Sequence, residues 1–156
     1  MSLDVARAFV RAASLWSREP SISELVDTVR LLCCEVLPYL RTHIAHPDDA
    51  LSAAITVFNR LTVNGRRVVI LTDRGDGSYR LFVEMPRITV ISVFSLRRDY
   101  TCIIVQTRVD PESLRTRFLG IRVERVKNAE GKVALCGSMM HACGAAIQVL
   151  RRVLEA

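Results

Sequence analysis

Hydrophobic and polar positions follow two different periods along this chain. Up to about residue 62, apolar residues recur every three to four positions, which is typical of amphipathic helices. From residue 64 onward they alternate with polar residues in short runs, and the helical spacing returns over residues 136–154. This order predicts an α+β fold: N-terminal helices, an antiparallel β-meander of about five strands, and a C-terminal amphipathic helix packed on the sheet. We expect a single domain over residues 1–156, with a helical part (1–62) and a part containing the sheet and the last helix (64–156).

The N-terminal part is predicted to contain three helices. The first covers residues 2–17. The second begins at Ser21, which forms a capping-box pattern with Glu24 three residues later. Pro38 is expected to end or kink this helix, because proline lacks an amide proton and its ring crowds the preceding turn. A third helix follows over residues 47–61.

Strands are predicted in the second half of the chain from runs rich in Val, Ile and aromatic residues. Asn64 and Gly65 form a turn signal before the first run, and residues 73–78 connect the first two runs as a loose hairpin loop. The runs cover residues 67–72, 79–85, 88–96, 100–109, 118–126 and, as a short segment, 132–135.

Two central runs, 88–96 and 100–109, are apolar on both of their alternating faces. Strands of this kind are normally covered on both sides, and large exposed apolar patches are rare on soluble monomers. The C-terminal helix can cover one face. We expect the second and third helices to cover the other, and a homodimer is the alternative.

Cysteine usage indicates a reducing compartment. The five cysteines are an odd number, and Cys33 and Cys34 are adjacent within a helical pattern. Free thiols explain this better than a disulfide framework. The N-terminus lacks the pattern of a secretion signal, and no apolar run reaches the length of about 20 residues that a membrane span needs. We therefore expect a soluble intracellular protein, cytoplasmic or nuclear, without a transmembrane segment.

No metal, cofactor or catalytic residue is predicted. Cys136, His141 and Cys143 are the one cluster that resembles a metal site, but on a helix His141 points away from the other two side chains. We interpret both cysteines as core residues and His141 as a surface residue. A cysteine nucleophile paired with a histidine base remains a remote alternative, since sequence alone cannot pair these residues.

Positive charge is concentrated in the second half of the chain. The net charge is +6, with −1 over residues 1–62 and +7 over residues 63–156. Several of the basic residues lie in turns or at strand ends and could gather at one sheet edge as a binding surface. These residues are Arg66, Arg67, Arg97, Arg98, Arg115, Arg117, Arg122, Arg125, Lys127, Arg151 and Arg152. The alternative is a solvated rim with salt bridges to Glu84, Asp99 and Glu124.

These features predict a non-catalytic intracellular binding or assembly module, an adaptor that docks a protein partner, including a second copy of itself, through a basic sheet edge. An acidic lipid is another candidate partner. The main alternative is a basic nucleic-acid binder, with RNA as its ligand. RNA-binding sheets usually expose aromatic side chains for base stacking. The candidates for that role here are Tyr79, Phe82, Tyr100 and Phe118.

The order of elements over residues 64–154, a β-meander followed by one covering helix, is similar to that of polo-box and kinase-associated C-terminal modules. The resemblance rests on element order alone. It implies docking of a protein or an acidic lipid rather than catalysis.

Overall fold

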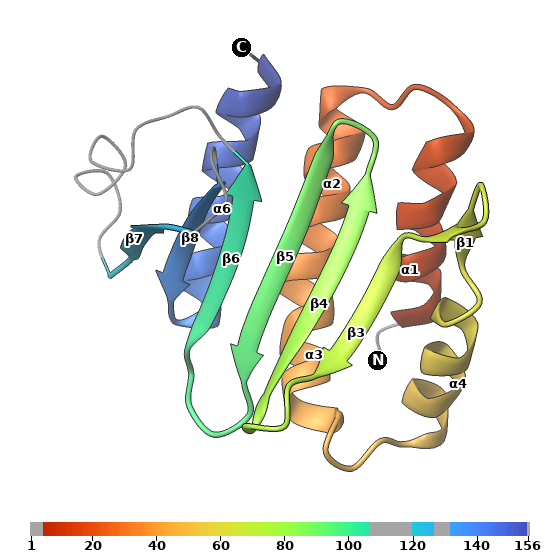
Figure 1. The fold of residues 1–156 in the computed structure, drawn as a ribbon, viewed down its shortest axis with the longest axis vertical. Helices are drawn as coiled ribbons and strands as arrows, with labels where there is room; N and C mark the ends of the chain where they lie inside the picture. The colour runs from red at the N-terminus through yellow and green to blue at the C-terminus, as the bar shows by residue number, and fades with distance from the viewer. Residues whose placement is uncertain (1–4, 107–119, 127–131, 156) are drawn as a thin grey trace.

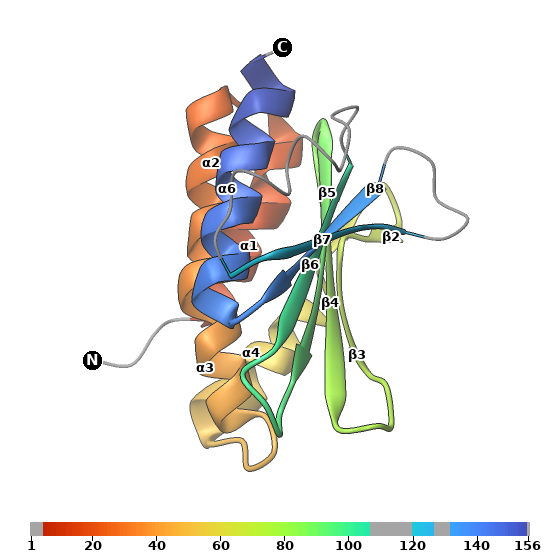
Figure 2. The same cartoon turned by 90° about the vertical axis from the view of Figure 1, so that its left-hand side faces the viewer.

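The fold has two layers, with helices on one side and a sheet on the other (Figures 1 and 2). The computed structural model describes residues 5–106, 120–126 and 132–155, with all of their side chains except those of Ala50, Val57, Phe58, Gln106 and Arg125. The predicted α+β class is confirmed, with N-terminal helices, an antiparallel sheet and a C-terminal helix packed on that sheet.

Among the described residues, the helical layer consists of four N-terminal helices and the C-terminal helix. They are α1 (Val5–Ser14) with a 3₁₀ turn (Leu15–Ser17), α2 (Ile22–Leu31), a π-helical segment (Leu32–Val36), α3 (Leu37–His43), α4 (Asp49–Phe58) and α6 (Met139–Glu155).

The sheet layer is a six-stranded antiparallel sheet, with a separate two-stranded hairpin beside it. The strands are β1 (Thr62–Val63), β2 (Arg66–Arg67), β3 (Val69–Asp73), β4 (Ser78–Met85), β5 (Ile88–Ser95), β6 (Thr101–Gln106), β7 (Arg122–Arg125) and β8 (Lys132–Gly137). Their order in the large sheet is β3-β4-β5-β6-β8-β7. β1 and β2 form the small hairpin, whose turn residues Asn64 and Gly65 both have positive φ angles, as a tight hairpin turn requires.

The second helix begins as predicted but does not end at Pro38. Ser21 accepts a hydrogen bond from the Glu24 amide and Glu24 reaches back to the Ser21 amide, so both halves of the capping box are present. The chain stays helical past Pro38 to His43, with the π-helical segment in the turn before the proline. A wider turn relieves the crowding between the proline ring and the preceding carbonyl groups, which is the physical reason for the difference.

The end of the sheet differs from a simple meander, because β8 lies between β6 and β7. β8 contributes buried Val133, Leu135 and Cys136, whereas β7 carries Arg122 and Glu124 on the surface. The more apolar strand therefore takes the interior position and the charged strand forms the edge, where charge discourages further pairing. Cys136 was expected at the start of the last helix, and that expectation is wrong: the helix begins at Met139.

The hydrophobic core fills the space between the two layers. Phe9, Leu25 and Leu40 from the helices, and Phe94 and Ile103 from the strands, are fully buried there. α6 packs on β6 and β8, and α2 packs beside α6. In Figure 2 every described helix lies on the same side of the six-stranded sheet. The expectation that the second and third helices cover the second face is therefore wrong, because α2 and α3, which form the predicted second helix, and α4, the predicted third, share the side of α6.

Candidate binding surface on the open face of the sheet

The sheet surface turned away from the helices is the candidate functional site, and we call it the open face. Because side chains alternate along a strand, the residues between the buried positions Leu81, Val83 and Met85 point to this side, as do their cross-strand partners. The side chains of the open face are Ile70, Thr72, Arg80, Phe82, Glu84, Thr89, Ile91, Val93, Cys102, Ile104, Arg122, Glu124, Lys132, Ala134 and Cys136.

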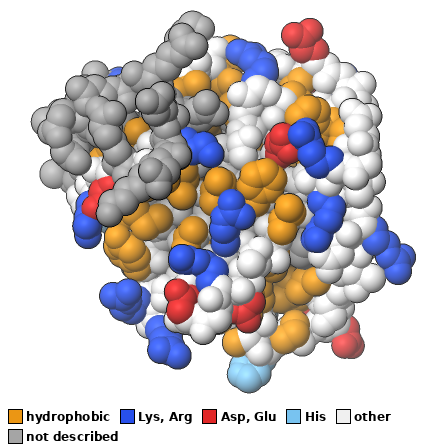
Figure 3. All heavy atoms as spheres, viewed as in Figure 1, with side chains coloured by type: hydrophobic (Ala, Val, Ile, Leu, Met, Phe, Trp, Pro, Cys, Tyr) orange, Lys and Arg blue, Asp and Glu red, His pale blue; other side chains and the backbone are white. Residues whose placement is uncertain are grey.

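An apolar row crosses the middle of the open face. Strand register aligns five hydrophobic residues from β3 to β8, and Glu124 of β7 ends the row. The five are Ile70, Phe82, Ile91, Ile104 and Ala134. Four of them are partly exposed, and Ile91 at the centre is 8% exposed. Figure 3 shows hydrophobic side chains across this face, with Lys, Arg, Asp and Glu among and around them.

The charged groups on the open face are mostly paired within the chain. Arg66 reaches from the β1–β2 hairpin to Glu84 of β4 at 3.0 Å, and Arg122 pairs with Glu124 within β7 at 2.5 Å. The guanidinium of Arg80 lies 5.6 Å from the centre of the Phe82 ring, within the range of a cation–π contact. Both signs of charge therefore lie around the apolar row.

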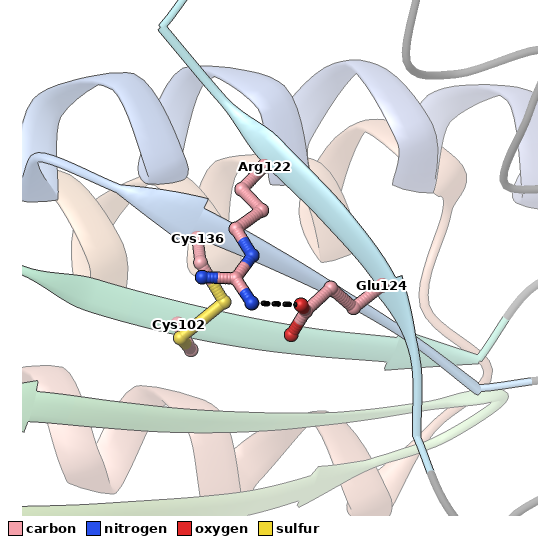
Figure 4. The surroundings of a disulfide bond; sticks show 4 residues. All are labelled: Cys102, Arg122, Glu124 and Cys136. Atoms are coloured by element: carbon pink, nitrogen blue, oxygen red, sulfur yellow. Dashed lines mark ion pairs between the residues drawn. A yellow bond between two sulfur atoms is a disulfide. The ribbon is translucent and has the colours of Figure 1, made fainter.

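A disulfide joins two strands on the open face. Cys102 of β6 and Cys136 of β8 lie directly opposite each other, with their Cα atoms 4.1 Å apart. Figure 4 shows the bond beside the Arg122–Glu124 ion pair. The prediction of five free thiols is therefore wrong for this pair. Thirty-four residues separate the two cysteines in sequence, and only the register of β6 against β8 brings them together. The intracellular location remains a prediction.

The other three cysteines form a cluster in the helical layer. Cys33 and Cys143 are buried, Cys34 reaches the surface, and the Cys143 thiol donates a hydrogen bond to the Cys33 carbonyl oxygen. Desolvation, together with the neighbouring Cys143 thiol, raises the pKa of Cys34 to about 11. A hydrogen-bonding interaction with Cys33 and burial raise the pKa of Cys143 as well. Both shifts favour the neutral thiol, which is a weak nucleophile.

The cluster of Cys136, His141 and Cys143 does not come together. Cys136 lies in the disulfide, Cys143 faces α2 and the π-helical segment, and His141 hydrogen-bonds with the Ser138 hydroxyl at the start of α6. Within the described ranges, no group of three or more His, Cys, Asp and Glu side chains could hold a metal ion.

The basic residues named from sequence lie in several separate places. Arg66 and Arg122 reach the open face from opposite ends of the strand order. Arg67 donates to the Asn59 side chain, outside the open face. The expected gathering at one edge is therefore wrong for the described members.

Four other basic residues of the set named from sequence lie in the turn after β5 and on the last helix. Arg97 and Arg98 lie in the β5–β6 turn, where Arg98 lies over the Tyr100 ring. Arg151 and Arg152 are exposed on α6, in the helical layer. Arg125 lies in β7, and its side chain is not described; Arg115, Arg117 and Lys127 lie outside the described residues.

Sequence reasoning missed the apolar row itself and its neighbours Arg80 and Lys132. Alternation in residues 79–85 and 88–96 already separated the two faces of these strands. Which of the two faces the helices leave uncovered was not contained in that pattern.

Of the three aromatic candidates that the structure describes, one lies on the open face. Phe82 is there, whereas Tyr79 stacks on buried Phe94 on the helical side. Tyr100 lies beside the β5–β6 turn, and Phe118 is outside the described residues.

Comparisons with protein families, curated proteins and solved structures found no match to this chain. Among the described helices, none combines the length and the hydrophobicity that crossing a bilayer requires.

Proposed function

We propose that this protein is a non-catalytic assembly module whose open face docks a flat protein surface. The apolar row from Ile70 to Ala134 carries the proposal, because it lies on a sheet face that no described helix covers. Sheets with two apolar faces are normally covered on both, and a contiguous apolar patch with a polar rim is typical of protein interaction sites. The partner surface is apolar at its centre and carries both signs of charge at its edges.

The pairing of charges favours a protein over an anionic polymer or an acidic lipid. Arg66 and Arg122, two of the arginines on this side of the sheet, already contact carboxylates of Glu84 and Glu124. Binding to phosphates requires cations that are available for several contacts at once. These two ion pairs neutralise two of the cations on this side of the sheet, and a face that carries both signs of charge suits a partner with charges of both signs.

Two further observations weigh against the alternatives. Single-stranded RNA is held on sheets by several stacked aromatic residues, and the described open face offers Phe82. A cysteine enzyme needs a thiol with a lowered pKa, whereas the pKa values of Cys34 and Cys143 are raised.

The test compares two matched substitutions to lysine. Ile104→Lys places a charge in the centre of the open face. Val10→Lys changes an aliphatic residue on α1 that is 45% exposed in the helical layer. Chemical cross-linking in the native cell identifies partners of the tagged wild-type chain, itself included, and each one is then purified and titrated against the three chains.

We expect binding by the wild-type chain and by Val10→Lys, and loss of binding by Ile104→Lys. Equal binding by all three chains would contradict the proposal, as would a wild-type chain that binds neither another protein nor itself. Tight binding to a labelled single-stranded RNA that weakens steeply with salt would favour the nucleic-acid alternative instead.

A further inference from the structure

Resting on the proposed function, we infer that the occupant of the open face is the open face of a second copy of this chain. The two sheets pack face to face, related by a two-fold axis that runs parallel to the strands between β5 and β6. This rotation places β4 of one copy over β8 of the other, and β5 over β6. Symmetric dimers use one surface patch twice, so the patch has to be complementary to itself.

The side chains at the four central positions of the apolar row satisfy this requirement, whereas at its rim the rotation sets Ile70 of β3 over Glu124 of β7. The row has its largest residue, Phe82, on β4 and its smallest, Ala134, on β8. The rotation sets Phe82 of one copy over Ala134 of the other, and Ile91 over Ile104. Alternating large and small residues across two facing layers is how packed sheets fill the space of about 10 Å between them.

Charges at one end of β4 and β8 are complementary in the same arrangement. Glu84 lies two residues beyond Phe82 on β4, and Lys132 lies two residues before Ala134 on β8. Strand register places both in the neighbouring row, on the same side of the apolar row. Glu84 of each copy therefore faces Lys132 of the other, and the rotation forms this pair twice. Both side chains are partly exposed, and Glu84 would contact Lys132 of the other copy in addition to its own Arg66.

The size of the open face fits a dimer interface. Six strands with a spacing of about 4.8 Å are about 24 Å wide, and six residues of a strand are about 20 Å long. The flat area is therefore about 480 Å² in each copy, and a corrugated surface exposes more than its flat projection. This is the range of a small, reversible dimer interface, below the standard size of ~800 Å² per partner.

The first test is the mass of the protein in solution. Light scattering is measured over a concentration series for the wild-type chain, whose monomer mass is 17.5 kDa. We expect twice the monomer mass, with dissociation on dilution. Ile104→Lys is expected to raise the dimer dissociation constant at least tenfold, and Val10→Lys to leave it unchanged. A wild-type chain that stays monomeric at high concentration would overturn the inference, and so would a dimer that Ile104→Lys does not weaken.

Charge reversal tests the orientation without touching the core. Glu84→Lys and Lys132→Glu each place like charges opposite each other, so each is expected to raise the dissociation constant about tenfold. The double variant Glu84→Lys/Lys132→Glu restores a pair of opposite charges between the copies. Its dimer dissociation constant is expected to lie within about threefold of the wild-type value. Thermal unfolding of each variant is measured as a control that the fold is retained. A double variant as weak as either single variant would refute this orientation.

Zero-length cross-linking with a carbodiimide gives an independent readout. Within one copy, β5 and β6 lie between β4 and β8, so the backbones of these two strands are about 14 Å apart. A zero-length reagent does not bridge this separation. A Glu84–Lys132 peptide formed between isotopically labelled and unlabelled chains is therefore expected from the dimer alone. Its absence from a cross-linked dimer would refute the proposed pairing.

These results separate this inference from the proposed function. If the chain is monomeric but binds a different protein that Ile104→Lys rejects, the self-docking inference is wrong and the assembly function stands. If the chain is monomeric and binds no protein, both are wrong.

Discussion

The carboxylate of Asp99 accepts a hydrogen bond of 3.0 Å from the backbone amide of Met139, forty residues away. The β5–β6 turn thus caps the N-terminus of α6, where four backbone amides lack partners within the helix. The sequence offered Asp99 as a salt-bridge partner for a basic rim, whereas in the structure its carboxylate forms this cap.

Replacing Asp99 is expected to weaken the attachment of α6 to the sheet. Asp99→Ala removes the acceptor and is expected to lower the free energy of unfolding by about 1 kcal/mol. Asp99→Asn keeps a side-chain oxygen and is expected to lose less than half as much. Urea denaturation of the three proteins measures the difference. An unchanged midpoint for Asp99→Ala would show that the Asp99 contact contributes nothing to stability.

Reduction of the Cys102–Cys136 disulfide is expected to destabilise the protein. The bond closes a loop of about 34 residues, and the loss of this restraint on the unfolded chain corresponds to about 3 to 4 kcal/mol. Urea denaturation with and without a reductant measures the change. The control is Cys102→Ala/Cys136→Ala, whose stability should not respond to the reductant.

The same disulfide predicts a thiol count. In denaturant without reductant, three cysteines are expected to react with a thiol reagent, and five after reduction. Five reactive thiols before reduction would show that the pair is open in the purified protein.

Cys34 is expected to react slowly at neutral pH although it reaches the surface. With a pKa of about 11, its reactive thiolate is scarce at pH 7 and increases about tenfold with each pH unit until the pH approaches 11. The rate of alkylation by iodoacetamide is measured between pH 7 and 10, with Cys34→Ser identifying the reacting site. A rate that levels off below pH 9 would contradict the raised pKa.

Replacing glycine by alanine is expected to change the stability of the protein in opposite directions at Gly137 and Gly144. A Cβ atom at Gly137 would lie 2.7 Å from the backbone oxygen of Gly120, so Gly137→Ala is expected to destabilise the fold by about 1 to 3 kcal/mol. Gly144 lies within α6 with nothing within 4 Å of the added atom. Gly144→Ala is expected to stabilise the protein by about 0.5 to 1 kcal/mol because alanine favours the helix. Thermal unfolding compares both variants, and a stabilising Gly137→Ala would contradict the close approach.

Local chemistry determined much of the fold. Capping by Ser21 and Glu24, the Asn64–Gly65 turn and the alternation along β4 and β5 each depend on residues only a few positions apart. Interactions of such short range can be predicted from sequence, because the chain geometry that they require is local. The fold class and most element positions followed from them.

Long-range packing decided the candidate site. The pairing of β8 with both β6 and β7 brought Cys102 opposite Cys136 and placed Arg122 on the edge strand β7, away from Arg66 on the β1–β2 hairpin. The side of the sheet on which α2 and α3 pack left the row from Ile70 to Ala134 uncovered by described helices. Sequence alone determined that the central strands are apolar on both faces. Which face the helices leave open depended on tertiary packing, because strands that are apolar on both sides can bury either one.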